Sequence, residues 1–280
     1  MARLGVLGWP VAHSRSPAMH NAALAALGME GWRYQRLPVP PALFEETARA
    51  LGDSGFVGAN VTIPHKRAAL AVAVQASEAA RAIGAANTLT CLPDGTLTAE
   101  NTDAPGLIAA LGGAVAGRRA LVLGAGGSAR AAVWGLREAG ASEVSIWNRT
   151  SERAEALARE LGARWVAAPE PADLLVNCTS VGLEGALEGS GVERSATDAE
   201  ALNQLGLTFD QVGEYSNVAD LVYRSTPTPL LAAARAHGSR TVDGLEILVA
   251  QGALSFELWT GRPAPRELMD RAAREEPPSA

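Results

Sequence analysis

The chain has few cysteines, one lysine and no long hydrophobic run, and each scarcity excludes a class of protein. The two cysteines, Cys91 and Cys178, are too few for a disulfide framework, and the four histidines show no ligand spacing with them, so we expect no metal site. No segment approaches the ~18 continuous apolar residues of a membrane span, and the N-terminal stretch lacks the apolar run of a signal peptide. We therefore expect a cytoplasmic protein with no membrane partner, whose cysteines pack as small hydrophobic residues.

The overall charge and the length narrow the choice further. A formal net charge of −6 argues against nucleic acid or an anionic membrane as a partner. The length of 280 residues, with 48% hydrophobic residues, suggests two α/β domains with a core each. An anionic ligand would therefore need a locally positive site.

Lysine is almost absent. Of the 24 lysines and arginines, only Lys66 is a lysine. A biased composition could leave one lysine by chance. The alternative is that this position needs a side chain whose pKa shifts readily, since arginine stays protonated and does not exchange a proton near neutral pH. Lys66 is therefore a candidate proton donor.

A βαβα pattern covers residues 118–163. It predicts a strand over Ala120–Leu123, a helix over about Gly127–Ala139, a strand over Val144–Trp147 and a second helix that ends at Gly162. A further buried strand is expected within 172–180. The pattern indicates a doubly wound, Rossmann-like domain.

The turn between the first strand and helix has the composition of a dinucleotide-binding turn. Such a turn needs glycines where the backbone bends sharply and approaches a pyrophosphate, and a small residue for close helix packing. The sequence supplies both, with Ala129 in the small position and a predicted cofactor-binding run of Gly124, Ala125, Gly126, Gly127 and Ser128.

The residues after the second strand favour NADP over NAD. An NAD enzyme usually places Asp or Glu there to bind the ribose 2′-hydroxyl. This chain has Asn148, Arg149 and Thr150, with Arg153 one turn later, and guanidinium groups suit a 2′-phosphate. The alternative is that Thr150 or Ser151 merely caps the next helix while both arginines are solvated.

Residues 1–103 have a separate βα rhythm, and hydroxyl groups stand at its first helix. Ser14 and Ser16 precede Pro17, a combination typical of a helix start, where backbone N–H groups attract a carboxylate or phosphate. Capping alone would explain Ser16 but not Ser14.

Polar residues also follow the later segments of this half. Asn60 and Thr62 alternate onto one face of a strand, and we expect Pro64 to begin a helix with Lys66 in its first turn, where the helix dipole disfavours a cation. Turns at Asn87 and Asp103 add an amide and a carboxylate, although Asp103 would also serve as a cap for the helix near Pro105.

The remaining sequence contains one long helix and one segment that is hard to interpret. Residues 243–261 show helical spacing of apolar residues, including Leu258, and most of this helix is expected to be core. Residues 183–217 are polar and rich in glycine, which indicates part helix and part loop.

Taken together, the motifs resemble those of shikimate dehydrogenases over nearly the whole chain. They are SRSP, NVTIPHK, GAANT, NTD, GAGGSAR, NRTSER, NCTSVG, DLVY, TPLL and DGLEILVAQGALSFELWTG. The resemblance implies a cytoplasmic enzyme of aromatic amino-acid (chorismate) biosynthesis that reduces 3-dehydroshikimate to shikimate with NADPH. It also implies an α/β substrate domain at 1–103, a Rossmann-like NADP domain at 104–237, and C-terminal helices at 238–280 that return to the first domain. A homodimer is left open.

The resemblance also assigns roles to individual residues. It implies Lys66 and Asp103 as the catalytic pair and Gly244 as a residue beside the nicotinamide. The substrate carboxylate is assigned to Ser14 and Ser16. The hydroxyl groups and surroundings of the substrate are assigned to Asn60, Thr62, Asn87, Tyr223 and Gln251.

Two departures and two rival functions remain at this stage. The segment from Gly182 to Asp220 looks longer than is usual in the family, and Ile247 replaces a frequent methionine, an exchange of similar volume. One rival is a quinate/shikimate dehydrogenase paralogue with broader substrate or cofactor use. The other is a cofactor-sensing module without turnover, which would be expected to lose the lysine and aspartate pair.

Overall fold

The structure is a computed structural model that describes residues 2–183, 197–224 and 226–275. The chain forms two compact units, one from Met1–Gly106 with Leu248–Ala280 and one from Leu107–Ile247. The sequence analysis placed its borders after residues 103 and 237. Composition has no signal for a border that lies inside a long helix, as the second one does.

The first unit contains a six-stranded mixed sheet with the order β2-β1-β3-β5-β6-β4. Strands β2, β1 and β3 are parallel, β5 is antiparallel to both β3 and β6, and β4 is parallel to β6. The carboxyl ends of β1, β2, β3 and β6 therefore meet at one edge, together with the amino end of β5. The strands are β1 Ala2–Gly8, β2 Trp32–Pro38, β3 Phe56–Val61, β4 Gln75–Ala76, β5 Thr88–Cys91 and β6 Leu97–Glu100.

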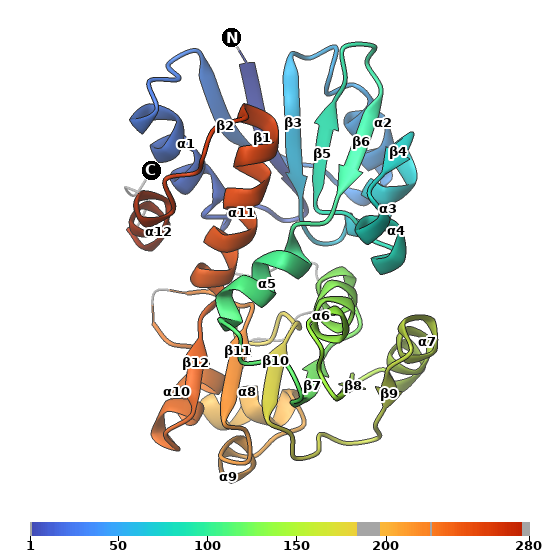
Figure 1. The fold of residues 1–280 in the computed structure, drawn as a ribbon, viewed down its shortest axis with the longest axis vertical. Coiled ribbons are helices and arrows are strands. Elements are labelled where there is room, and N and C mark those ends of the chain that lie inside the picture. The colour runs from blue at the N-terminus through green and yellow to red at the C-terminus, as the bar shows by residue number, and fades with distance from the viewer. Residues whose placement is uncertain (1, 184–196, 225, 276–280) are drawn as a thin grey trace. The chain divides into compact units, whose positions relative to one another are not determined.

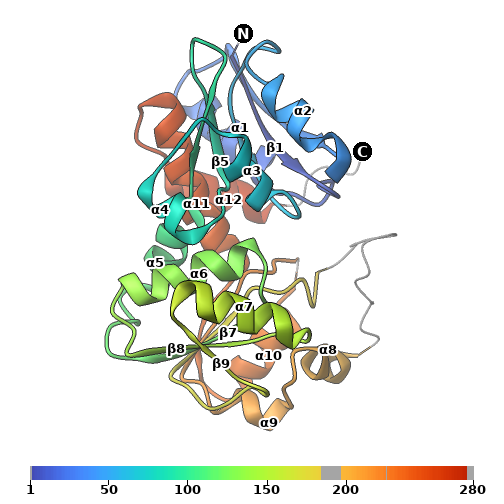
Figure 2. The same ribbon diagram turned by 90° about the vertical axis from the view of Figure 1, so that its right-hand side faces the viewer.

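Helices cover both faces of this sheet (Figures 1 and 2). Within the unit, α1, α12 and the end of α11 lie on one face, whereas α2 and α3 lie on the other. Side chains of β3 alternate accordingly, since Ala59 packs with Phe44 of α2 and Asn60 bonds to Ser255 of α11. The helices are α1 Ser16–Ala26, α2 Phe44–Arg49 after a 3₁₀ turn at Pro41–Leu43, α3 Lys66–Val72, α4 Glu78–Ile83, α5 Asp103–Leu111, α11 Gly244–Thr260 and α12 Arg266–Arg274.

Three predicted helix starts in this unit were wrong in detail. Helix α1 has Arg15 at the N-cap with no side-chain cap, so capping does not explain Ser16. Helix α3 begins at Lys66 rather than Pro64, because a turn closed by the His65 N–H to the Thr62 oxygen at 2.9 Å comes first. The Asn101 side chain, not Asp103, caps α5 by accepting the Ala104 N–H at 3.2 Å. These findings remove two alternative explanations, the capping roles proposed for Ser16 and Asp103.

The second unit is a doubly wound α/β domain with six parallel strands in the order β12-β11-β10-β7-β8-β9. Residues of α5, α6 and α7 pack on one face, and residues of α8, α9 and α10 pack on the other. The Rossmann-like fold predicted from the βαβα pattern is confirmed. The elements are β7 Arg119–Leu123, α6 Gly127–Glu138, β8 Glu143–Trp147, α7 Ser151–Leu161, β9 Arg164–Trp165, β10 Leu174–Asn177, α8 Asp198–Gln204, α9 Phe209–Val212, β11 Asn217–Asp220, α10 Pro229–Ala236 and β12 Arg240–Val242.

Several smaller expectations can be judged from the packing. Both cysteines are partly buried and pack against hydrophobic clusters, and Ile247 is a buried member of the cluster that packs with α6 and α7. Most apolar residues of 243–261 are buried, as expected, whereas Leu258 is 51% exposed. Short helices α8 and α9 occupy part of 183–217, while 184–196 lie outside the described residues.

The described residues contain neither a membrane-spanning helix nor a metal-binding cluster. Within residues 2–183, 197–224 and 226–275, no helix has the length and apolarity needed to cross a membrane. The same part of the chain contains no cluster of three or more histidine, cysteine, aspartate or glutamate residues arranged to hold a metal ion.

Candidate active site

Lys66 and Asp103 form an ion pair at the edge of the first unit's sheet. The Lys66 Nζ lies 2.6 Å from Asp103 Oδ2, and the two side chains are only 11% and 16% exposed. Lys66 follows β3 and Asp103 follows β6, whose carboxyl ends share this edge. A nearly buried ammonium and carboxylate at this distance form a charge-assisted hydrogen bond with little solvent screening. The resemblance implied these two residues as a pair, and they are in direct contact.

Asn87 holds the other oxygen of the same carboxylate. Its Nδ2 donates to Asp103 Oδ1 at 2.9 Å, while its Oδ1 accepts the backbone N–H of Thr102 at 2.7 Å. A backbone N–H can only donate, so the amide oxygen must face Thr102 and the amide nitrogen must face Asp103. Asp103 therefore accepts on both oxygens, from Lys66 and from Asn87, which fixes its orientation.

Gln251 of α11 joins this group through the same amide. Its Oε1 lies 3.0 Å from Asn87 Nδ2 and 3.3 Å from Thr102 Oγ1, and its Nε2 donates to the Leu248 oxygen at 2.8 Å. Asn87 has two N–H donors but three acceptors in range, which include Thr102 Oγ1 at 2.9 Å. The Thr102 hydroxyl can supply the missing donor to Gln251.

A buried hydroxyl cluster connects Asn60 to this group. The Asn60 Nδ2 lies 2.9 Å from Ser255 Oγ and 3.2 Å from Thr88 Oγ1, and the Asn60 Oδ1 accepts a hydrogen bond from the Tyr34 hydroxyl at 2.8 Å. Ser255 also lies 3.2 Å from Thr102 Oγ1. Asn60 is thus occupied by protein partners on both ends of its amide, which favours support of the site over direct contact with a ligand.

Tyr34 is held in turn by the core. The His20 ring stacks on it with centroids 4.3 Å apart, and burial lowers the pKa of His20 to about 3. A neutral, stacked His20 braces Tyr34 without adding a charge beneath the polar cluster.

Ser14, between β1 and α1, and Ser16, the first residue of α1, lie at the same edge, and both are buried. The Ser14 Oγ accepts the Ser16 N–H at 3.3 Å. Among the described residues, neither hydroxyl group donates to a protein acceptor, and the Thr62 hydroxyl has no side-chain partner there. These hydroxyl donors are available to a ligand, although no hydrogen bond in the described part of the chain links them to Lys66.

The glycine turn of the second unit lies between β7 and α6. Gly124 has φ +111°, and a Cβ there would lie 3.2 Å from the Cys178 carbonyl carbon, so a side chain would be strained and crowded. An added Cβ at Gly126, the N-cap of α6, would meet nothing within 4 Å, and no side chain caps that helix. Within the described residues, the start of α6 is therefore suited to face an anion such as a pyrophosphate.

The predicted 2′-phosphate residues follow β8 in the same unit. Arg149 and Arg153 are exposed, and neither guanidinium has a hydrogen-bond or ion-pair partner among the described residues. The Asn148 side chain donates to the Thr150 oxygen at 2.9 Å, and Thr150 is the N-cap of α7 but accepts no side-chain cap bond. Capping by Thr150 therefore does not account for this motif.

Tyr223 and Gly244 belong to the second unit as well. A Cβ on Gly244 would lie 2.6 Å from the Val222 oxygen, so only glycine permits this approach of α11 to the segment after β11. The fully buried Asp220 anchors that segment through Asn177 Nδ2 at 2.8 Å and Thr228 Oγ1 at 2.6 Å. Burial raises the pKa of Asp220 to about 6, against the opposing effect of these hydrogen bonds.

The sequence analysis missed the residues that support the predicted ones. Thr88 and Thr102 stand inside quoted motifs, so their place beside Asn87 and Asp103 was a usable signal. Tyr34 lies outside the quoted motifs, and Ser255 lies within the C-terminal one, far from Asn60 in the sequence. Only the packing of β2 and α11 brings the two residues to Asn60.

Comparison with known families agrees with this arrangement. Residues 6–89 match the model of the shikimate dehydrogenase substrate binding domain, and residues 107–178 match that of shikimate / quinate 5-dehydrogenase. Residues 244–274 match the shikimate 5'-dehydrogenase C-terminal domain. Together these matches include the positions of most of the residues described above.

Individual relatives are similar over almost the whole chain. A shikimate dehydrogenase (NADP(+)) of Methylobacterium radiotolerans is 48% identical, with 96% of this chain and 95% of that protein covered. A shikimate 5-dehydrogenase from Thermus thermophilus, solved in complex with NADP(H) and shikimate, is 43% identical, with a TM-score of 0.81 and 98% and 99% of the chains covered.

A third relative acts on a different compound. A ligand-free 5-ketofructose reductase of Gluconobacter sp. strain CHM43 is 30% identical, with a TM-score of 0.79 and 97% of each chain covered. The fold by itself thus does not decide the substrate. The full-length identity and the three family matches do decide the family, and the chain belongs to the shikimate dehydrogenases.

Proposed function

We propose that the chain reduces 3-dehydroshikimate to shikimate with NADPH, reversibly, with Lys66 and Asp103 as the groups that act on the substrate. This reaction belongs to aromatic amino-acid biosynthesis. The observation that carries the proposal is the pair of Lys66 Nζ and Asp103 Oδ2 at 2.6 Å, held by Asn87 at the sheet edge where ligands of α/β proteins bind.

The second unit fits NADP on its own geometry. The uncapped start of α6 and the open space over Gly126 suit a pyrophosphate. Arg149 and Arg153, which have no partner within the described residues, suit a 2′-phosphate. When bound, the nicotinamide supplies the hydride to the ring ketone. The protein positions the reactants and manages one proton.

Lys66 donates its proton to the oxygen that was the ketone, or at the least stabilises the charge that develops on it. Asp103 keeps the ammonium in place and accepts a hydrogen bond from an adjacent substrate hydroxyl. The hydroxyl groups of Ser14 and Ser16 bind the substrate carboxylate, and we assign the remaining polar groups of the substrate to Thr62, Gln251 and Tyr223. Asn87 orients the Asp103 carboxylate through a hydrogen bond, and Asn60 supports the site through its bonds to Tyr34 and Ser255.

The test is the appearance of the reduced-nicotinamide absorbance with shikimate and NADP, with quinate and NAD as controls. Turnover with shikimate and NADP, well above that with quinate, is the expected result. Comparable rates with quinate would indicate the broader paralogue, and no turnover with intact cofactor binding would indicate a sensing module. The cytoplasmic location and the assembly state stay predictions.

Replacing both Ser14 and Ser16 with alanine is expected to raise the KM for shikimate by about 100-fold or more and to leave the KM for NADP nearly unchanged. Two hydrogen bonds to a charged carboxylate, at roughly 1.5 to 3 kcal/mol each, would be lost. Steady-state kinetics with each substrate varied in turn measures this.

The free energy of unfolding distinguishes a substrate-binding role of these serines from a purely structural one. Within the described residues, the side-chain bond lost is that from the Ser16 N–H to Ser14, so the free energy of unfolding should fall by about 1 kcal/mol or less. Ser77→Ala, which removes the side-chain cap of α4, is the matched control and should lower stability without changing the KM for shikimate. Unchanged KM in the double variant would contradict the carboxylate assignment.

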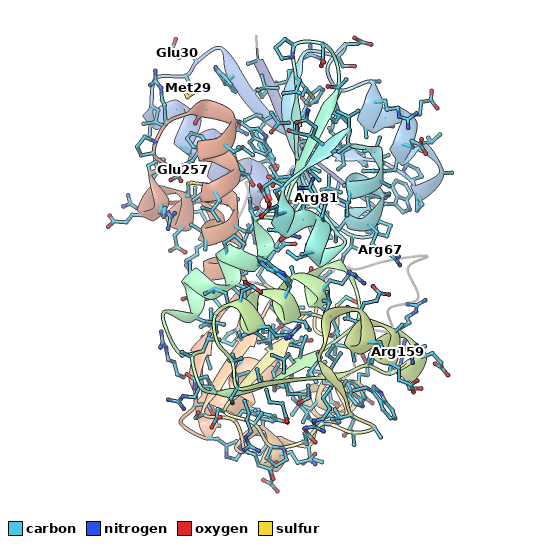
Figure 3. The ribbon with its side chains drawn as sticks, turned by 45° about the vertical axis from the view of Figure 1, so that its right-hand side comes forward. Met29, Glu30, Arg67, Arg81, Arg159 and Glu257 are labelled. Atoms are coloured by element: carbon cyan, nitrogen blue, oxygen red, sulfur yellow. The ribbon has the colours of Figure 1, made fainter. Side chains whose placement is uncertain are left out.

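Arg149→Ala is expected to weaken NADP binding by about 10- to 150-fold and NAD binding far less. The reason is the loss of charge-assisted hydrogen bonds of roughly 1.5 to 3 kcal/mol to the 2′-phosphate. Arg159 of α7, also exposed and labelled in Figure 3, provides the matched control, and Arg159→Ala should leave both affinities unchanged. Equal losses for the two cofactors would rule out the 2′-phosphate role.

A further inference from the structure

Arg36 of β2 is a cation beside the two serines that the proposed function does not use. Its Nε and Nη2 donate to the Ser14 backbone oxygen at 3.2 and 2.8 Å. Strand β2 is parallel to β1, and Arg36 is paired with Val6, so it stands near the carboxyl ends that form the site edge. Its side chain shares a strand face with Tyr34, whose hydroxyl reaches Asn60.

The guanidinium has spare donors and no anion. The fork on Ser14 uses two of its five N–H groups. Within the described residues, no carboxylate pairs with Arg36 and no other hydrogen bond from it is present. Arginine forks match carboxylates, so the spare donors of Arg36 suit an anionic substrate.

The neighbouring imidazole adds no second charge. Desolvation and, to a smaller extent, the charge of Arg36 lower the pKa of His13, so His13 is neutral at pH 7. Arg15, the other arginine of this loop, donates instead to the Glu275 oxygen at 2.9 Å. Arg36 is thus the charged side chain bound to the Ser14 loop on the side of β2.

We propose that Arg36 is a specificity-determining residue that supplies the positive charge for the substrate carboxylate and orients the Ser14 hydroxyl through the Ser14 carbonyl. This inference rests on the proposed function and deepens it, because the two hydroxyl groups supply hydrogen bonds but no positive charge to balance that of a carboxylate. A cation beside them selects an anionic cyclic substrate over a neutral sugar of similar size.

The experiment compares Arg36→Gln and Arg36→Lys with shikimate and with its neutral methyl ester. Arg36→Gln should lower kcat/KM for shikimate by about 10- to 100-fold, mainly through KM, with the KM for NADP unchanged. Arg36→Lys keeps the charge but loses the fork on the Ser14 oxygen, so its loss should be clearly smaller than that of Arg36→Gln. With the methyl ester, the Gln variant should lose less than about threefold.

Arg33→Gln is the matched control, because Arg33 is an exposed arginine of the same strand and its replacement removes the same charge. It should leave kcat/KM unchanged. Raising the salt concentration should lower kcat/KM for shikimate in the wild type and have less effect in Arg36→Gln.

Each contrary outcome overturns a defined claim. Equal losses in the Gln and Lys variants, or equal losses with acid and ester, would show that Arg36 only braces the loop. No loss in Arg36→Gln would remove it from substrate binding. Failure of the wild type to oxidise shikimate with NADP would refute the proposed function itself. The wild-type measurement therefore tests the function, and the comparison with the Arg36 variants tests the role of Arg36.

Discussion

Lys66→Arg is expected to reduce turnover by on the order of 10² to 10⁴ while substrate binding stays within about tenfold. This is roughly 3 to 5 kcal/mol of activation free energy. Arginine keeps the positive charge but does not release a proton near neutral pH, because its pKa is too high. The exchange therefore separates proton transfer from charge stabilisation at the position where the chain keeps its only lysine.

Three measurements make the result interpretable. Single-turnover kinetics across pH 6 to 9 gives the chemical step, a shikimate titration gives binding, and a melting curve checks that the larger side chain is tolerated at a site only 9% exposed. Arg67→Lys is the control, since Arg67 is the next residue, is exposed and is labelled in Figure 3. Near-normal turnover of Lys66→Arg throughout this range would show that the ammonium is not needed as an acid.

Asp103→Asn is expected to lower turnover by a similar factor, on the order of 10² to 10⁴. Asp103 accepts on Oδ2 from Lys66 and on Oδ1 from Asn87, whereas an asparagine has one acceptor oxygen and one donor nitrogen. In either orientation, one contact becomes donor against donor. Asn87 cannot turn its amide to accept instead, because its Oδ1 already accepts the Thr102 N–H, so one of the two contacts is lost.

The double variant tests whether the two residues act as a unit. Lys66→Arg combined with Asp103→Asn should lose about as much turnover as either single change, because the second change removes a partner that no longer functions. Asp53→Asn, at an exposed carboxylate of the same unit, should leave turnover unchanged. Losses that multiply in the double variant would contradict a shared role.

The ion pair also affects stability. Its side chains are 11% and 16% exposed, so Asp103→Asn leaves an ammonium largely buried without its counter-charge. Removal of one partner from a buried pair costs ~3 to 5 kcal/mol, and the residual exposure places this site at or below the low end. Turnover must therefore be compared at temperatures well below the melting point of the variant.

The sequence alone determined the fold class, the family and the order of the chemical groups along the chain. Periodic hydrophobicity and the glycine turn were sufficient for β7, α6, β8 and α7, because local propensity and burial agree there. The lone Lys66 was a compositional signal that needed no structure. Helix starts at Ser16, Lys66 and Asp103 were mislocated or misattributed, since capping depends on which side chain reaches a free N–H.

Tertiary structure decided which of these groups meet and which only support others. Asp103 lies 37 residues from Lys66, and Ser255 lies 195 residues from Asn60, yet each pair is in hydrogen-bond contact because mixed strand directions and α11 bring them to one sheet edge. Arg36 had no motif at all, and its fork on Ser14 follows from the parallel pairing of β2 with β1. Contacts between distant segments depend on strand order and register, which local sequence patterns do not encode.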